Sequence, residues 1–367
     1  MGDGGPGPGL VVAPFVPVIM NHYCTYFDRG FLAQGLALGR SLAAHDPAAV
    51  LWVLALDDFT AQVLRALGEP ALRVVTLAEL EAGDPALAAA KANRSRVEYY
   101  FTLSPCWPRW LLQSRPEIDR LVYVDADMLF FSSPQPVWQE LVQGSILLCA
   151  HRFPAFLAHY EKHGRYNVGV LGWKRDAAGL ACLEWWRERC LEWCYDRLEP
   201  GRYADQKYLE EWPQRFAGVV ECRHPGVNLA PWNWMSHRLV VTPAALTVDG
   251  QPLVVFHFAR FRAQCGDWWW QSGQLDYAVM PWSVRQAIYG AYWQALQSAG
   301  RALGRIAPDW NGERLPARLS RDFWRTLPLR LLFGSDWLRL GGTFVSGRLG
   351  LGRCSGRVLA WLRQLRS

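Results

Sequence analysis

The sequence predicts an α/β protein built on a doubly wound, mostly parallel sheet with helices on both faces. Over the first 150 residues, short apolar runs alternate with longer segments whose apolar residues recur at helical spacing. Several short runs are apolar throughout, which is typical of strands buried on both faces. The 367 residues, 51% of them hydrophobic, are also enough to bury a large core.

The alternation assigns the elements of this first part in order. Residues 21–30 are polar and aromatic and are expected to form a loop after the first strand. The helix over 95–112 is expected to break near its two prolines, Pro105 and Pro108. The predicted strands are 15–20, 50–56, 73–77, the run that begins at 121, and 145–150. The predicted helices are 31–44, 60–67, 78–92, 95–112 and 137–141.

The second part of the chain continues this pattern and then changes character. A glycine-containing strand is predicted over 166–173, a long helix over 177–197 and a last apolar strand over 253–258. From about residue 276, apolar residues and arginines alternate at helical spacing, as in 329–340 and 358–366. The predicted organisation is a flexible leader (1–14), a main domain (15–275) and a basic amphipathic helical extension (276–367).

The positive charge belongs to this extension. Thirteen arginines and only four acidic residues follow residue 300, whereas the whole chain has a net charge of +6. Basic amphipathic helices suit an anionic membrane surface, for which the segment 301–367 is the candidate. The extension could instead pack on the core with a solvated basic face. RNA is a third and weaker reading, since no RNA-binding module accompanies the arginines, and no nucleic-acid partner is expected.

The cysteines and the start of the chain bear on the compartment. Nine cysteines are scattered without a C-x-x-C pair, which favours buried free thiols in a reducing compartment. The leader has no lysine or arginine and does not resemble a signal peptide, and no apolar run reaches membrane-spanning length. A cytoplasmic protein is expected, with peripheral attachment to the inner face of the cytoplasmic membrane as an option.

Two aspartates, Asp125 and Asp127, follow the buried run 121–124 with one alanine between them. Ionised carboxylates at the end of such a strand are costly unless something compensates them. Strand alternation would point both to the same side, where they could share Mg²⁺ or Mn²⁺ and, through it, a diphosphate. The alternative is a polar corner with unrelated carboxylates.

Other polar residues are expected at the same edge of the sheet. The segments 21–26, 57–58 and 151–152 also follow predicted strands. In open parallel sheets, ligands bind beyond the carboxyl ends of the strands. The coincidence of these segments with Asp125 and Asp127 therefore predicts a ligand site there.

These residues resemble a known pattern. The chain is similar, over roughly residues 15–262, to glycosyltransferases of the GT-A type, closest to the family 8 enzymes that include glycogenin and bacterial lipooligosaccharide galactosyltransferases. More narrowly, it resembles bacterial nucleotide-diphospho-sugar transferases found with surface-polysaccharide genes. The matching motifs are Tyr123-Val-Asp-Ala-Asp127, Asn167-Val-Gly169, Gly201-Arg-Tyr-Ala-Asp-Gln-Lys207, Gly226-Val-Asn-Leu-Ala-Pro-Trp-Asn233 and His257-Phe258.

The resemblance implies a metal-dependent transfer of a sugar, a UDP-hexose being the expected donor, to a glycan or lipid-linked saccharide acceptor. In the family the Asp-x-Asp pair and a late histidine bind Mn²⁺, and Asp125, Asp127 and His257 match those positions. An imidazole beside carboxylates suits Mn²⁺ better than Mg²⁺. The metal would neutralise charge on the leaving nucleoside diphosphate. A retaining outcome is implied as well.

Further residues take roles from the same resemblance. Asn167 matches an asparagine that lines the donor sugar. Asp205 and Gln206 match a catalytic Asp-Gln pair, in which the acid holds sugar hydroxyls and the amide lies near the face opposite the leaving group. Such a pair would stabilise an oxocarbenium-like transition state. A helix N-cap is the structural alternative for Asp205.

Nucleotide contacts are expected from two groups of residues. Asn21 and Tyr26 lie where the base and ribose sit in the family, and an aromatic ring there could stack on uracil. The second group consists of cations that could contact the phosphates, namely Lys91, Arg94, Arg260 and Arg262. Lys91 and Arg94 could equally be surface cations that contact no phosphate.

The chain departs from the family at two places. Arg260 stands where the family has a glycine after the histidine, and the usual lysine is missing, so Arg260 or Arg262 could supply the cation. The arginine usually found about 20 residues before the Asp-x-Asp is also absent, where this chain reads Val97-Glu-Tyr-Tyr-Phe-Thr-Leu103.

Two other functions compete with sugar transfer. One is a non-catalytic nucleotide-sugar-binding protein, which the altered residues after His257 keep open. The other is a phosphatase or phosphotransferase with an aspartate nucleophile, which the run Asp127-Met-Leu129 fits poorly.

Overall fold

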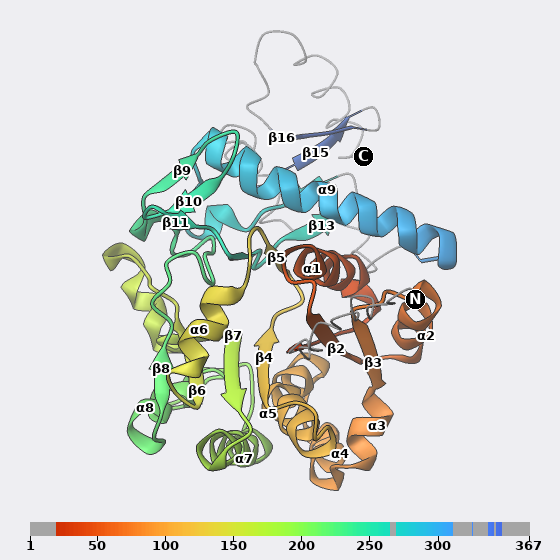
Figure 1. Ribbon diagram of the computed structural model, residues 1–367, viewed down its shortest axis with the longest axis vertical. Coiled ribbons are helices and arrows are strands. Elements are labelled where there is room, and N and C mark those ends of the chain that lie inside the picture. Colours follow the sequence, from red (N-terminus) through yellow and green to blue (C-terminus); the bar gives the residue numbers. More distant parts are fainter. Residues whose placement is uncertain (1–19, 265–268, 311–324, 326–336, 341–342, 347–367) are drawn as a thin grey trace, which may run out of the picture.

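The computed structural model describes residues 20–264, 269–310, 325, 337–340 and 343–346 (Figure 1). Its centre is a seven-stranded sheet in the order β3-β2-β1-β4-β7-β6-β8. Neighbouring strands are parallel except for β7, which runs antiparallel to β4 and β6. The strands are β1 (Asn21–Phe27), β2 (Ala49–Ala55), β3 (Leu72–Thr76), β4 (Arg120–Val124), β6 (Ile146–Ala150), β7 (Tyr166–Lys174) and β8 (Val219–Glu221). The prediction of a mostly parallel α/β sheet is confirmed.

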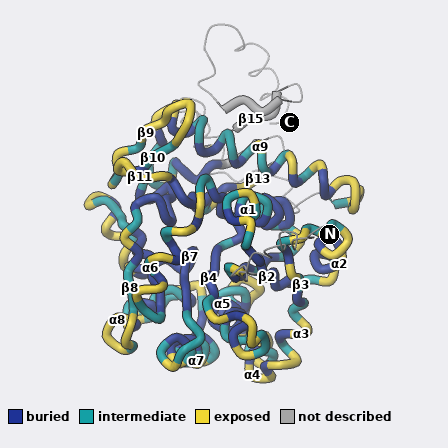
Figure 2. Tube along the Cα trace, in the orientation of Figure 1, coloured by how far each residue is buried: buried dark blue, intermediate teal, exposed yellow. Residues whose placement is uncertain are grey.

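Helices cover both faces of this sheet and bury its apolar side chains in two clusters, and Figure 2 shows the central strands buried. Residues of α1, α2, α6 and α9 belong to the first cluster, and residues of α3, α4, α5, α7 and α8 to the second. The helices are α1 (Leu32–His45), α2 (Asp58–Leu67), α3 (Leu77–Ala82), α4 (Pro85–Ala90), α5 (Arg96–Ser114), α6 (Gln135–Val142), α7 (Ala177–Glu192), α8 (Trp212–Arg215) and α9 (Trp282–Ile306).

The prediction of a loop over 21–30 is wrong for most of its length. Residues 21–27 form β1, which pairs with β2 and β4 in the middle of the sheet. Two polar residues of this strand have side-chain partners inside the protein: Asn21 donates to Asp46, and Trp52 donates to His22. Partnered polar side chains can sit in a central strand, although they hide its apolar pattern. Most of the predicted strand 15–20 lies outside the described residues.

The expected break at Pro105 and Pro108 is also absent. Helix α5 runs from Arg96 to Ser114 through both prolines. Its N-terminus is closed by a capping box, in which Ser95 and Glu98 bond each other's backbone N–H groups. Both prolines are buried. Burial in the second cluster outweighs the backbone hydrogen bonds that the prolines remove.

The segment after residue 276 begins with a helix that belongs to the core. Helix α9 contacts α1, α2 and β9, and its residues Ile288, Tyr289 and Tyr292 lie in the first cluster. The hydrophobic core therefore continues across the predicted boundary at residue 276. No helix in the described ranges is both long and apolar enough to cross a membrane.

The helix expected over 329–340 is wrong for its described part. Residues Trp337–Leu340 form β15, which pairs with β16 (Thr343–Ser346) and with β14 (Trp269–Gln271). β14 in turn pairs with β13 (Arg262–Gln264). Apolar and arginine residues in a short run fit either a helix or a strand, and pairing decides between them. The predicted helix over 358–366 lies outside the described residues.

Two small sheets flank the main one. β5 (Met128–Phe130) leaves the large sheet after β4 and pairs antiparallel with β12 (Val255–His257). β9 (Leu239–Val241), β10 (Leu246–Val248) and β11 (Gln251–Pro252) form a three-stranded sheet. The β5–β12 pair matters most for function, because it joins the residues after β4 to a segment 130 positions later in the chain.

Candidate active site

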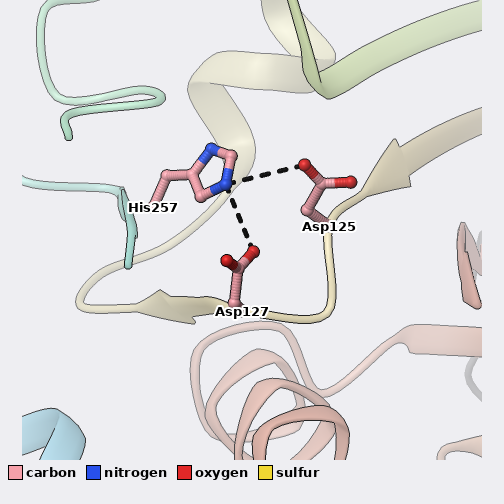
Figure 3. A group of neighbouring side chains, drawn as sticks. All are labelled: Asp125, Asp127 and His257. Carbon is pink, nitrogen blue, oxygen red and sulfur yellow. Dashed lines mark ion pairs between the residues drawn. The ribbon is translucent and has the colours of Figure 1, made fainter. Parts of the chain in front are cut away.

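Asp125, Asp127 and His257 form one group beyond the carboxyl end of β4 (Figure 3). The Nε2 atom of His257 lies 3.2 Å from Oδ1 of Asp127 and 3.6 Å from Oδ2 of Asp125. One ligand atom from each residue lies within 4.8 Å of the others. The structure thus brings together the three residues expected to bind a metal.

The backbone explains how this group forms. Asp125 follows β4, and Asp127 lies in a turn before β5, so the two carboxylates converge across a turn and not by strand alternation as expected. The register of β5 on β12 sets His257 opposite Met128. The backbone N–H of Asp125 donates to the carbonyl of Gly169, and that of Phe258 to the carbonyl of Asp127. Strands β5, β7 and β12 therefore hold the three side chains in place.

The charges of the group suit a divalent cation. Burial raises the pKa of the Asp125 carboxyl, the charge of His257 opposes this rise, and the charge of Asp127 adds to it. Burial alone would lower the pKa of His257, but Asp127 and Asp125 outweigh it, and the net shift is upward. The two carboxylates thus favour the protonated form of His257. A cation bound by oxygens of both acids and Nε2 would take the place of that proton.

Glycine at position 169 makes room for this group. A Cβ at Gly169 would lie 2.5 Å from Oδ1 of Asn167, 2.7 Å from Cε of Met128 and 2.8 Å from Nδ1 of His257. Any side chain there would displace one of them. The glycine of the Asn167-Val-Gly169 motif is thus required by the close approach of β7 to His257.

Asp205 lies buried next to this group. Burial raises its pKa to about 7; a hydrogen bond with Ser104 opposes the rise, and the charge of Asp125 adds to it. The Ser104 hydroxyl also lies 3.0 Å from the hydroxyl of Tyr26, and Tyr123 donates to Oδ1 of Asp125 over 2.7 Å. The hydroxyls of Tyr26 and Tyr123 also share a hydrogen bond. A series of hydroxyl groups therefore leads from Asp205 to the metal-ligand candidate Asp125.

Gln206 and Asn167 lie together at the same edge of the sheet. Nδ2 of Asn167 is 3.4 Å from Oε1 of Gln206 and 3.3 Å from Nε2 of His151. His151 follows β6 and is buried, and burial lowers its pKa to about 4. The expected donor-sugar residue and the expected catalytic amide thus contact each other directly.

An aromatic wall continues outward from His257. The ring of Trp232 meets the His257 ring edge-on at 5.1 Å, and Tyr277 lies 6.1 Å from Trp232. Arg260 lies over Tyr277, pairs with Asp276 at 3.2 Å and is half exposed. Its φ of +62° is a conformation that favours glycine, the residue expected there from the resemblance.

Three predicted contact residues are engaged elsewhere. Asn21 lies at the amino end of β1, away from the edge where Asp125 lies. Lys91 pairs with Glu81. Arg94 donates to the hydroxyl of Tyr195 and to two backbone carbonyls, those of residues 190 and 191. Tyr26 does lie at the carboxyl end of β1, and Arg262 is exposed on β13.

No family model matches the chain. Two proteins of Bacillus subtilis (strain 168) are similar to it in sequence. The uncharacterized protein YfnF is 35% identical over 250 residues, which is 65% of this chain and 81% of YfnF. The uncharacterized protein YfnD is 30% identical over 243 residues, 65% of this chain and 78% of YfnD. The chain belongs to the family of YfnF and YfnD.

Solved structures with a distant likeness to this member of the YfnF family are glycosyltransferases. The galactosyltransferase LgtC, solved with donor and acceptor sugar analogs, has a TM-score of 0.47 and 15% identity, and the likeness covers 83% of this chain and 99% of LgtC. Mouse xyloside xylosyltransferase 1 has a TM-score of 0.41 and 15% identity, covering 66% and 98%.

The structure adds residues that sequence reasoning did not assign to the site. These are Ser104, Tyr123, Asn228 and Trp232. His151 was expected at this edge of the sheet as part of the segment 151–152, but without a role, and Tyr123, Asn228 and Trp232 lie in motifs that carry the resemblance. Ser104 carries no such signal, because it lies inside α5 and reaches Asp205 only through the packing of that helix.

Proposed function

We propose that the protein is a metal-dependent glycosyltransferase, which moves a sugar from a nucleotide-diphospho-sugar to a glycan acceptor. One observation carries the proposal: the group of Asp125, Asp127 and His257 lies at the same sheet edge as the buried Asp205 and the paired amides of Asn167 and Gln206. The first three suit a cation that binds a diphosphate, and the last three offer the hydrogen-bonding groups that a sugar needs.

The proposed roles follow from the chemistry of each group. The bound cation would neutralise the negative charge that develops on the nucleoside diphosphate as the sugar–phosphate bond breaks. Asp205 would accept hydrogen bonds from sugar hydroxyls. The amide of Gln206 would stabilise positive charge near the anomeric carbon by its carbonyl dipole. Asn167 would line the sugar beside it.

The finer assignments are part of the same proposal. Mn²⁺ is the favoured ion because one ligand is an imidazole. The donor is a UDP-hexose and the outcome retaining, both from the resemblance. Arg260, half exposed beyond Tyr277, is the cation proposed to contact the diphosphate. The acceptor is a cell-surface polysaccharide or lipopolysaccharide precursor, reached by a cytoplasmic protein at the inner face of the membrane.

The first experiment measures metal and nucleotide binding together. Mn²⁺ binding is followed by electron paramagnetic resonance, and thermal shift is recorded with UDP, GDP and CDP, with and without Mn²⁺. We expect Mn²⁺-dependent stabilisation by UDP, since a ligand that binds only the folded state stabilises it. Asp127→Asn should abolish both signals. Asp249→Asn is the matched control, because Asp249 also contacts a histidine, His237, but on the β9–β11 sheet.

The second experiment separates transfer from the alternatives. Release of UDP from UDP-sugars, with and without saccharide acceptors, reports transferase activity. Release of inorganic phosphate from a phosphate monoester such as p-nitrophenyl phosphate, with no release of UDP from UDP-sugars, would favour the phosphatase. Binding without any release would favour the non-catalytic binding protein. If no nucleotide bound with Mn²⁺ present, the donor-site proposal would be wrong.

A further inference from the structure

The buried imidazole of His151 contacts the donor-sugar residue proposed above, yet it lies outside the metal group. Its Nε2 atom is 3.3 Å from Nδ2 of Asn167, and its Nδ1 atom is 3.2 Å from the carbonyl oxygen of Arg165. An amide nitrogen only donates and a carbonyl oxygen only accepts. His151 therefore carries its proton on Nδ1 and presents the lone pair of Nε2 to Asn167. Its charged form, which has no lone pair, does not fit this geometry.

The imidazole ring is held in this orientation from two sides. Phe153 stacks on it at 4.8 Å between ring centroids, with 9° between the planes, and the ring of Trp232 meets it at 5.4 Å. The Nε1 atom of Trp232 also donates to the carbonyl oxygen of His151. The ring cannot turn without displacing Phe153, so the acceptor atom is fixed in direction.

The far side of the Asn167 amide is fixed as well. Its Oδ1 atom accepts from the backbone N–H of Gly169 and from Nδ2 of Asn228, both at 3.0 Å. Two donors at Oδ1 and one acceptor at Nδ2 leave a single orientation for the amide. Without the His151 lone pair, Nδ2 would lose its closest acceptor.

The oriented amide of Asn167 in turn orients the amide of Gln206. Nδ2 of Asn167 lies 3.4 Å from Oε1 of Gln206, and Nε2 of Gln206 donates to the carbonyl oxygen of His163 over 3.2 Å. These two contacts set the carbonyl end of Gln206 toward Asn167 and its nitrogen toward His163. The dipole of the proposed catalytic amide thus depends on a chain of contacts that begins at His151.

We propose that His151 is a positioning residue, whose Nε2 lone pair orients the Asn167 amide and, through it, the amide of Gln206. The inference deepens the proposed function, on which its catalytic consequence rests. A misplacement of about 1 Å at a reacting centre can cost about 100-fold in rate. The effect should therefore fall mainly on kcat for sugar transfer, with a smaller rise in the KM for the donor, whose sugar Asn167 is proposed to line.

Three substitutions separate the contact of Nε2 with Asn167 from the contact of Nδ1 with Arg165. His151→Phe keeps the ring and loses both contacts. In His151→Gln, the amide reaches the place of Nε2 and can offer an oxygen to Asn167. In His151→Asn, the shorter amide reaches only the place of Nδ1 and Arg165. His22→Phe is the matched control, because His22 is also buried and hydrogen-bonded but lies at the amino end of β1.

Two readouts are recorded for each variant, kinetics with Mn²⁺ and NMR with Mg²⁺ in its place, because paramagnetic Mn²⁺ broadens the NMR signals of nearby side chains. Steady-state kinetics gives kcat and KM for donor hydrolysis or transfer. Nitrogen-15 NMR gives the ring tautomer of His151 and the hydrogen exchange of the Asn167 and Gln206 side-chain amides. We expect kcat to fall about 10- to 100-fold in His151→Phe and His151→Asn and to be restored to within about 5-fold in His151→Gln. The wild-type ring should carry its proton on Nδ1 at neutral pH.

The outcomes separate the inference from the proposed function. Equal losses in Gln, Asn and Phe variants that follow their melting temperatures would overturn the positioning role, as would a proton on Nε2 of His151. If the wild type transfers no sugar, the proposed function fails, and the NMR readout still decides the orientation. Faster amide exchange at Asn167 and Gln206 in His151→Phe alone would then support the geometry without the catalytic consequence.

Discussion

The carboxyl group of Asp205 is buried without a cation beside it among the described residues, and its pKa rises to about 7. Its partner is the uncharged Ser104 of α5. The arginine that the resemblance leads one to expect before the Asp-x-Asp would lie on this helix, where the chain has Val97-Glu-Tyr-Tyr-Phe-Thr-Leu103. An acid in such surroundings changes its charge near neutral pH. Donor binding and stability should both depend on pH there.

The stability of the metal-free protein should reflect this carboxyl. Its folded-state pKa lies above the unfolded value of about 3.9, so the folded state holds the proton more tightly. The resulting stabilisation is complete below the unfolded pKa and is lost as pH rises toward 7. Asp205→Asn removes this dependence. In EDTA, we expect the melting temperature of Asp205→Asn, measured relative to that of the wild type, to rise as the pH is increased from 5 to 8. A constant difference would contradict the raised pKa.

Gly169 offers a second test at the scale of one residue. A methyl group there would collide with Asn167, Met128 and His257, so Gly169→Ala should weaken Mn²⁺ binding about 10- to 100-fold, as disturbing the support of a metal ligand does. Gly300→Ala is the control, because a Cβ on Gly300 in α9 meets open space. It should stabilise the protein by about 0.5–1 kcal/mol. Isothermal titration and chemical denaturation measure the two effects, and unchanged Mn²⁺ affinity in Gly169→Ala would contradict the close approach.

At the scale of elements, the sequence predicted what depends on local pattern. The alternation of apolar runs and helical periodicity located β2, β3, β4, β6 and β7, and the polar residues after β4 predicted the site. The pattern failed at β1, because Asn21 and His22 are polar and find partners only in the folded sheet. It failed again at α5, where burial overrides two prolines. Pairing and burial are long-range effects that a residue pattern does not contain.

The pairing of β5 within the site is another long-range contact that the residue pattern does not contain. Its pairing with β12 brings His257 to Asp127, and nothing local in either run predicts that partner. The resemblance predicted the three metal-ligand candidates, whereas the residues supported the aspartates alone. Ser104 was not assigned to the site, and His151 was expected there only as part of the segment 151–152, since the contacts of both come from the packing of β6 and α5 against β7 and the segment around Asp205.

Helix α9 gives a prediction at this scale. Ile288 is fully buried among α1, α2 and the strands, whereas Ile306 at the end of the helix is 43% exposed. Ile288→Ala should therefore lower the free energy of unfolding by about 2–4 kcal/mol. Ile306→Ala should change it by at most about 0.5 kcal/mol. Urea denaturation measures both. Equal effects would mean that α9 does not share the core of the sheet.

Burial of α9 also bears on the metal group. Tyr292 of α9 stacks on Phe258 at 3.7 Å between ring centroids, and Phe258 directly follows His257. The residues after position 276 thus support the site through the side chain next to a ligand candidate. Any shortening of the chain that removes α9 would disturb the metal group as well as the core.

At the scale of the whole molecule, the packing of α9 against the core and against Phe258 limits which truncations can test membrane attachment. A chain cut near residue 280 would lose α9, so its loss of membrane binding could not be separated from unfolding. Removing residues 347–367 keeps every described residue and takes away five arginines with no acidic residue. Basic residues near an anionic surface contribute about 1 kcal/mol each to binding.

We therefore expect the chain ending at Ser346 to bind vesicles of anionic lipid much more weakly than the full chain, while its melting temperature and UDP binding with Mn²⁺ stay the same. Cosedimentation with vesicles measures the first and thermal shift the second. A full-length variant with those five arginines changed to glutamine is the control, because it removes the charge at constant length. Unchanged vesicle binding in both variants would exclude this segment as the membrane contact, since the attraction comes from its charge.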